Sequence, residues 1–184
     1  MPPPAPIAAS RHKHVEWQPD GPDSQWCAMD FEKVLVLFRA LGDQSVDYIL
    51  VGAIGMTVHG IVRATQDVDL FVRPQENNIA RLRAALRSLF PEDASIGDIT
   101  AADLAGEYPA IRYNSPDGSL QIDLLARLGQ AFAYEDLRFE EKLYEGVPVR
   151  VATAQTLYEM KKNTVRLRDR ADAETLKEEF GLEE

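Results

Sequence analysis

The run of residues 67–72, Asp-Val-Asp-Leu-Phe-Val, begins with alternating acidic and apolar side chains and is stopped by Pro74. Successive side chains of a β-strand point to opposite faces, so this run predicts a strand with Asp67 and Asp69 side by side on one face. Two carboxylates about 4 Å apart repel by roughly 4 kcal/mol at an effective dielectric constant near 20. A fold therefore tolerates this pair where a cation binds between the two groups, or where the face is a solvated edge.

A third carboxylate, Asp123, lies in the otherwise apolar run of residues 120–125. An acid in such a strand needs a partner, because burial of an unpaired charge is costly. If this strand neighbours the one that holds the first pair, the three carboxylates converge, and such hard oxygen ligands suit Mg²⁺ shared with substrate phosphates. The alternative for Asp123 is a buried salt bridge with Arg112 or Arg127.

A glycine-containing turn precedes the acidic run. Residues 48–51 are typical of a buried strand that Gly52 breaks, and residues 53–59 favour a short helix that ends at Gly60. The turn thus places backbone N–H groups at a helix N-terminus, where anions bind, and glycine lets a phosphate approach the backbone closely. A phosphate cradle beside a metal trio is what phosphoryl or nucleotidyl transfer requires. The alternative is that the turn serves only tight packing between strand and helix.

The remaining chain alternates strands with helices and includes one hairpin around the turn sequence Ser-Pro-Asp-Gly at residues 115–118. We therefore expect an α/β fold with a small mixed sheet, flanking helices and a C-terminal helical appendage. The expected boundaries are a Pro-rich arm at residues 1–28, an α/β core at residues 29–152 and a helical segment at residues 153–184. The individual elements expected are helices at 29–41 and 75–89, strands at 111–113, 120–125 and 147–151, and a loop with one short helix at 91–107.

A basic stretch, residues 161–170, stands out in an acidic chain because it holds five basic residues and one acid. Apolar residues at helical spacing over residues 157–171 predict one continuous helix, on which Lys162, Arg166 and Arg170 would stack. Like charges at this spacing destabilise a helix by a few tenths of a kcal/mol each, so a bound anion would relieve them. The alternative is a face on which aspartates of the same helix form salt bridges with the arginines.

Composition excludes several classes of protein. The net charge of −10 and the pI near 4.8 argue against non-specific coating of DNA, which needs clustered lysine and arginine. A single cysteine, Cys27, excludes an intrachain disulfide and a cysteine-based metal site, and it suits a reducing compartment. The first residues lack the apolar core of a signal peptide, and no apolar run is long enough to span a bilayer. We therefore expect a cytoplasmic protein that does not enter a membrane.

The segment Val51-Gly52-Ala53, followed after thirteen residues by Asp67-Val68-Asp69-Leu70, resembles the signature of the polymerase-beta-like nucleotidyltransferase superfamily. In that superfamily a Gly-containing turn precedes an acidic pair, and a third acid comes from a later strand. Arg63-Ala64-Thr65 before the acidic pair and Met160-Lys161 near the C-terminus are similar to the bacterial AbiEii-like and minimal nucleotidyltransferases. The resemblance covers residues 47–176. It departs at Ala53, where the family usually has Gly or Ser, so a serine hydroxyl is missing as a phosphate contact.

The resemblance implies a sheet of the nucleotidyltransferase type and a metal-dependent transfer of a nucleoside monophosphate from an NTP to a hydroxyl acceptor. Mg²⁺, with Mn²⁺ as the alternative, would be held by Asp67, Asp69 and Asp123, which are also the expected catalytic residues. The acceptor candidates are a tRNA, a protein and a small molecule. An alternative class is a toxin–antitoxin or phage-defence component that binds an antitoxin partner, or a nucleotide-binding module without catalysis. The residues expected to bind the nucleotide are Gly52, Ala53, Gly55, Arg63, Lys161 and Arg166.

Overall fold

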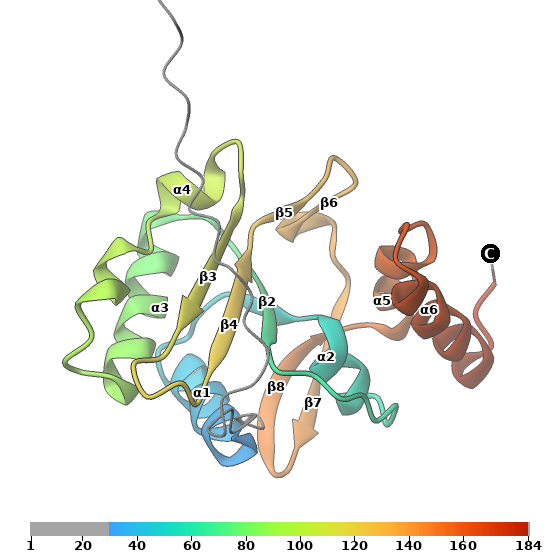
Figure 1. The fold of residues 1–184 in the computed structure, drawn as a ribbon, viewed down its shortest axis with the longest axis horizontal. Coiled ribbons are helices and arrows are strands. Elements are labelled where there is room, and N and C mark those ends of the chain that lie inside the picture. The colour runs from blue at the N-terminus through green and yellow to red at the C-terminus, as the bar shows by residue number, and fades with distance from the viewer. Residues whose placement is uncertain (1–29, 184) are drawn as a thin grey trace, which may run out of the picture.

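The computed structural model describes residues 30–183, which form a six-stranded mixed sheet with helices on both faces (Figure 1). The strands are β1 (Tyr48–Leu50), β2 (Val68–Val72), β3 (Ala110–Asn114), β4 (Gln121–Leu125), β7 (Phe139–Tyr144) and β8 (Val147–Ala152). They lie in the order β3-β4-β2-β1-β8-β7. Within this order, β4 with β2 and β1 with β8 are parallel pairs, and the other three pairs are antiparallel. The expected N-terminal arm, with Cys27, lies outside the described residues.

Two layers of helices enclose the sheet. One core lies between the sheet and the pair α1 (Phe31–Asp43) and α3 (Glu76–Leu89), and a second core lies under α2 (Gly52–Val58), α5 (Ala154–Lys162) and α6 (Leu167–Phe180). Among the described helices, none is long and apolar enough to cross a membrane. The shorter elements are α4 (Ala101–Ala105), the 3-10 helices η1 (Ala94–Asp98) and η2 (Tyr134–Asp136), and the two-stranded ribbon of β5 (Arg127–Leu128) and β6 (Phe132–Ala133).

The two faces of β2 explain how the core positions the acidic residues. Val68 and Leu70 are fully buried in the core beneath α1 and α3, whereas Phe71 belongs to the second core. Alternation along the strand turns Asp69, and Asp67 just before the strand, to the same side as Phe71. This side is therefore apolar at the end of β2 and acidic where the chain enters it.

The predicted α/β fold with a small mixed sheet is confirmed, and so are the hairpin of β3 with β4 and the strand that became β8. The sequence did not indicate β7, because the run of Glu140, Glu141 and Lys142 interrupts any apolar alternation. Such charges are typical of an edge strand, where they discourage pairing with another sheet. The β5–β6 ribbon, with two residues in each strand, is too short to leave a pattern.

The prediction of one continuous helix through the basic stretch is wrong. The chain leaves the helical conformation between α5 and α6, where Val165 is 95% exposed and Leu167 is 75% exposed. The break lets the two helices lie side by side (Figure 1), so that Leu157 on α5 and Leu176 on α6 are both buried in the second core. The expected ladder of three cations on one helical face therefore does not exist.

Asn78 ties α3 to the chain before β1 and is fully buried. Its Oδ1 accepts a hydrogen bond from the N–H of Asp47 at 2.7 Å, and its Nδ2 donates to the carbonyls of Asp47 and Arg73 at 2.9 and 3.0 Å. Asn78→Ala should lower the free energy of unfolding by about 2 to 4 kcal/mol, because these buried groups lose their partners. Urea denaturation measures the loss. Asn77→Ala, at the exposed neighbouring position, should change it by less than about 0.5 kcal/mol, and equal losses at both positions would contradict the assignment.

Candidate active site

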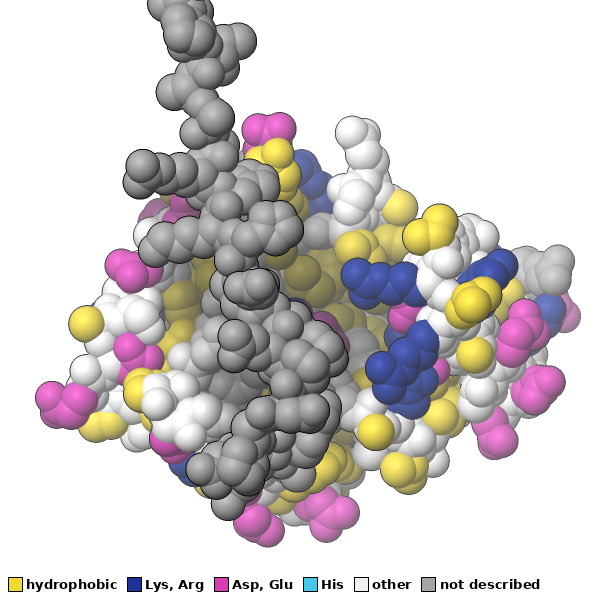
Figure 2. All heavy atoms as spheres, in the orientation of Figure 1, with side chains coloured by type: hydrophobic (Ala, Val, Ile, Leu, Met, Phe, Trp, Pro, Cys, Tyr) yellow, Lys and Arg dark blue, Asp and Glu magenta, His cyan; other side chains and the backbone are white. Residues whose placement is uncertain are grey.

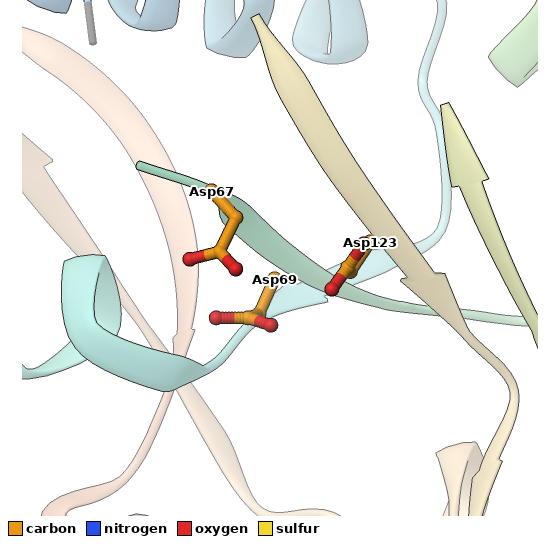
Figure 3. Close-up of side chains that lie close together, drawn as sticks. All are labelled: Asp67, Asp69 and Asp123. Atoms are coloured by element: carbon orange, nitrogen blue, oxygen red, sulfur yellow. The ribbon is translucent and has the colours of Figure 1, made fainter. Parts of the chain in front are cut away.

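Three carboxylates meet at one point of the sheet (Figure 3). Asp69 on β2 and Asp123 on β4 are direct partners in the parallel pairing of the two strands, and Asp67 comes from the residue before β2. One oxygen from each of the three carboxylates lies within 4.8 Å of the other two. The side chains that the sequence singled out from two separate segments are thus brought together by the strand register.

The electrostatics of this cluster favour a bound cation. Burial raises the pKa of Asp69 to about 6, with further increases from the charges of Asp67 and Asp123, while Lys161 and Arg112 lower it in part. The folded protein therefore holds a carboxylate that its surroundings destabilise. Three carboxylate oxygens without nitrogen or sulfur ligands are the donor set that hard divalent cations such as Mg²⁺ and Mn²⁺ prefer. The residues present thus fit such an ion.

Arg112 on β3 completes the electrostatic surroundings of Asp123. Its Nε and Nη2 donate to the two carboxylate oxygens of Asp123, each at 2.7 Å, in a two-pronged salt bridge. Of the two arginines that sequence reasoning offered as partners, Arg127 instead donates to the carbonyl of Gly106 at 3.5 Å. Asp123 therefore has both a cationic partner and a place in the carboxylate cluster, two roles that the sequence presented as alternatives.

Gly52 lies so close to Asp69 that no larger residue fits. Its φ is +65°, a conformation that side chains with a Cβ rarely adopt, and a Cβ at this position would lie 1.9 Å from Oδ2 of Asp69. The N–H of Val51 donates to the carbonyl of Asp69 at 3.0 Å, which fixes the start of α2 against β2. Helix starts leave N–H groups without intrahelical partners, and Val51 has no side chain that could cap them.

Gly55 has a different place from Gly52. A Cβ at Gly55 would face the carbonyl of Leu50 at 3.4 Å and the side chain of Leu157 at 3.6 Å. This glycine is buried where α2 packs against β1 and α5, and it is absent from the lining of the cavity described next. The packing interpretation of the turn therefore describes Gly55, whereas Gly52 and Ala53 face the open side.

A cavity of about 620 Å³ opens over the three carboxylates and is bounded by α5 and the start of α6. Figure 2 shows lysine and arginine side chains gathered on the α5–α6 side of this face. Apolar side chains from β4, β5 and α5 line another part of the wall. Of the residues expected to bind the nucleotide, those that line the cavity are Gly52, Ala53, Arg63, Lys161 and Arg166.

Two of these cations share one buried acid. Asp172 on α6 is 4% exposed and accepts hydrogen bonds from Arg63 and, at 2.9 Å, from Nζ of Lys161. Nζ of Lys161 also lies 3.2 Å from Oδ1 of Asp169. The aspartates of α6 thus form salt bridges, as the alternative interpretation expected. Their partners are Arg63 and Lys161 and not the arginines of their own helix. The sequence analysis did not assign Asp172 to the site. The pattern that could have identified it is an acidic residue on the otherwise apolar face of the helix that also carries Leu176.

The other lining groups differ in how firmly they are held. Thr65, which sequence reasoning did not assign to the site, donates from Oγ1 to Oδ1 of Asp67 at 2.5 Å and so orients that carboxylate. Arg168 donates to the carbonyl of Ala64 at 3.2 Å. Within residues 30–183 the side chain of Arg166 has no hydrogen-bond or ion-pair partner, which leaves its guanidinium available to an anion at the cavity.

A known protein family matches most of this chain. The model of the family described as Nucleotidyl transferase AbiEii toxin, Type IV TA system, matches residues 35–171. None of the curated proteins compared with the chain is a significant match.

Three solved structures share the fold at low sequence identity. An antigenic nucleotidyltransferase-like protein from Paracoccidioides brasiliensis is 16% identical, with a TM-score of 0.50 over 79% of this chain and 73% of that one. The protein ANT(2")-Ia, solved in complex with adenylyl-2"-tobramycin, is 12% identical, with a TM-score of 0.51 over 82% of this chain and 88% of that one. A protein from Thermotoga maritima assigned as a nucleotidyltransferase is 14% identical, with a TM-score of 0.51 over 83% and 95% of the two chains.

The close approach of Gly52 to Asp69 predicts a sharp intolerance to a methyl group. Gly52→Ala should lower the free energy of unfolding by about 2 to 4 kcal/mol, because it adds a clash to the cost of a positive φ. Gly118→Ala is the matched control, since Gly118 has a φ of +69° but nothing within 4 Å of its Cβ position. Its loss should be about 1 kcal/mol. Thermal or urea denaturation of both variants checks the difference, and equal losses would show that Asp69 is not in the way.

The raised pKa of Asp69 makes the stability of the metal-free protein depend on pH. Between 3.8 and about 6 the folded protein binds this proton more tightly than the unfolded chain, so the free energy of unfolding falls as the pH rises through that window. Asp69→Asn removes this penalty and should raise the free energy of unfolding by up to about 3 kcal/mol at pH 7.5, and by about half as much at pH 5. Urea denaturation without metal at the two pH values measures both gains. A gain of the same size at both would rule out the titration of Asp69 as its cause.

Proposed function

We propose, since the chain belongs to the AbiEii family of nucleotidyltransferases, that it transfers a nucleoside monophosphate from an NTP to a hydroxyl acceptor with the help of a divalent cation. The observation that carries this proposal is the convergence of Asp67, Asp69 and Asp123 in a cavity beside the tight turn at Gly52. Carboxylates that hold a metal and backbone donors that hold a phosphate are the two parts that nucleotidyl transfer needs.

The three carboxylates would hold Mg²⁺ or Mn²⁺, which supplies charge neutralisation at the triphosphate and polarises the phosphate that is attacked. The N–H groups of Gly52 and Ala53, which line the cavity, donate to phosphate oxygens at the start of α2, while the absent Cβ of Gly52 leaves room for the side chain of Asp69 beside this turn. Asp123 is the group that accepts the proton of the attacking hydroxyl. The new bond joins the acceptor oxygen to the α-phosphorus, and the bond from that phosphorus to the bridging oxygen breaks, so that pyrophosphate leaves.

The cations of the cavity have graded roles in this proposal. Lys161 and Arg63 are held by Asp172, so their donor groups have fixed positions toward the triphosphate and are partly neutralised by that acid. Arg166 lies in the connection between the helices and lacks a partner among the described residues, which suits contact with the phosphate tail or with the acceptor. The acceptor is a hydroxyl of a tRNA, a protein or a small molecule.

The description of the family as a toxin of a type IV TA system supports a second and compatible proposal. In it, transfer by this chain harms the cell that makes it, and an antitoxin partner counteracts the harm. The three carboxylates link the two proposals, because a toxic effect that arises from transfer needs them. A toxic effect that survives their substitution would belong to a different activity.

Mg²⁺ and an NTP together should stabilise the protein more than the sum of either alone, because the cation shares its ligands between carboxylates and phosphates. A ligand at 100 times its dissociation constant adds about 2.7 kcal/mol to the free energy of unfolding. Thermal-shift series with metal, each NTP and both measure this synergy. Incubation with labelled NTP, Mg²⁺ and total cellular RNA or protein then measures transfer of the label.

Asp67→Asn should abolish both the synergy and the transfer, while Asp43→Asn should leave both unchanged. Asp43 is an exposed residue at the end of α1, so it controls for loss of an aspartate as such. If transfer is toxic, cells that express the unmodified protein or the Asp43→Asn variant should grow slowly, whereas cells that express the Asp67→Asn variant should grow normally. Transfer that persists in the Asp67→Asn variant would refute the proposal, and absence of both synergy and transfer in the unmodified protein would show that the site does not work as an enzyme.

A further inference from the structure

Arg112 forms the closest ion pair in the carboxylate cluster, although it comes from the edge strand β3. It stands directly opposite Asp123 in the antiparallel register of β3 with β4. Its two bonds of 2.7 Å reach both oxygens of Asp123, so the planar guanidinium fixes the rotation as well as the position of the carboxylate. The side chain of Asp123 is 20% exposed and that of Arg112 is 55% exposed, so the pair stands on the wall of the cavity.

We propose, building on the transfer function proposed above, that Arg112 is a positioning residue. It fixes the carboxylate of Asp123 beside Asp67 and Asp69 and leaves one lone pair on each of its oxygens for a cation or a substrate proton.

The count of lone pairs supports this role. An ionised carboxylate offers about four acceptor positions on its two oxygens. The two-pronged bond from Arg112 uses one on each oxygen. A metal ligand must keep a free lone pair, and a group that accepts a proton must keep one as well. Arg112 therefore restrains Asp123 without occupying the positions that the proposed chemistry needs.

The charge of Arg112 also offsets repulsion inside the cluster. It interacts with Asp67 and Asp69 as well as with Asp123, and these acids raise the pKa of Arg112. A lysine at this position would supply the same charge but only a single donor group without the planar fork. The substitution Arg112→Lys therefore separates the effect of the arginine's geometry from the effect of its charge.

The test compares Arg112→Lys and Arg112→Gln with Arg127→Lys and Arg127→Gln. Arg127, on β5 just after β4, lines no part of the cavity and does not contact Asp123, so its variants are matched controls for the loss of an arginine. Two readouts are used: Mn²⁺ affinity from the electron paramagnetic resonance signal of free Mn²⁺, and kcat and KM for transfer. Substitution of groups that orient a metal ligand costs roughly 10 to 100-fold in affinity or activity.

We expect Arg112→Lys to weaken Mn²⁺ binding about 10-fold and to lower kcat by about 10 to 100-fold, with the KM for NTP changed less than about 3-fold. The Arg127 variants should match the unmodified protein. In a background of Asp123→Asn, the change of Arg112 to Lys should add no further loss, because the two residues act as one unit.

Three outcomes would overturn the proposal. If Arg112→Lys equals the unmodified protein, charge alone matters and the fork does not position Asp123. If the Arg112→Gln variant binds Mn²⁺ more tightly than the unmodified protein and catalyses transfer at the same rate, the arginine only competes with the cation. If KM rises while kcat stays, Arg112 is a phosphate ligand. Should the unmodified protein bind Mn²⁺ without any transfer, the proposed function fails, while the Mn²⁺ affinities of the variants still decide the role of Arg112.

Discussion

The parallel pairing of β2 with β4 determines where the acidic residues meet. In this register Asp69 and Asp123 are neighbours, and the residues that alternate with them, among them Leu70 and Ile122, are fully buried in the first core. A shift of either strand by one residue would turn its apolar side chains into the cavity and its aspartate into the core. The burial of apolar side chains on one face thus holds the carboxylates in place on the other, and core packing and site geometry cannot vary independently.

Charge balance inside the cavity differs from that of the whole chain. Among residues 30–183, five carboxylates and five cationic side chains line it, although the chain carries a net charge of −10. Most of these cations already bond to carboxylates or to a carbonyl, as Arg112 does to Asp123 and Lys161 does to Asp169 and Asp172. Arg166 and Arg168 are the lining cations that no carboxylate of residues 30–183 pairs, so they are the positive charges that a triphosphate meets most directly. Because the charges that line the cavity are equal in number and opposite in sign, a bound divalent cation would supply much of the neutralisation of a triphosphate.

The sequence predicted the elements whose signal is local. The alternation around Asp67 and Asp69, the turn at Gly52 and the apolar run that holds Asp123 each predicted a strand or a turn at the right place. Prediction failed where long-range contacts decide. The break between α5 and α6 has no proline or glycine to mark it, and it lets both helices contribute buried side chains to the second core.

The partners of the charged residues were the least predictable part of the site. Helical spacing suggested that Asp169 and Asp172 neutralise arginines of their own helix, and the helix break removed that geometry. The actual partners, Lys161 and Arg63, come from other elements. Only the ion pair of Arg112 with Asp123 could be predicted from the sequence, because residues on either side of a short turn lie close together in a hairpin. Ion pairs that cross between elements depend on tertiary packing, which no local pattern records.

Asp172 binds Arg63, 109 positions away, and Lys161, 11 positions away, through one carboxylate. This sharing makes the three residues strongly epistatic. Loss of Asp172 leaves Arg63 without its acid and Lys161 with Asp169 alone, so a substitution at Asp172 would disturb both cations even if only one of them touches the substrate. Drift at these positions is then expected to occur in concert, and a homologue that replaces Asp172 with a neutral residue should also carry replacements at Arg63 or Lys161.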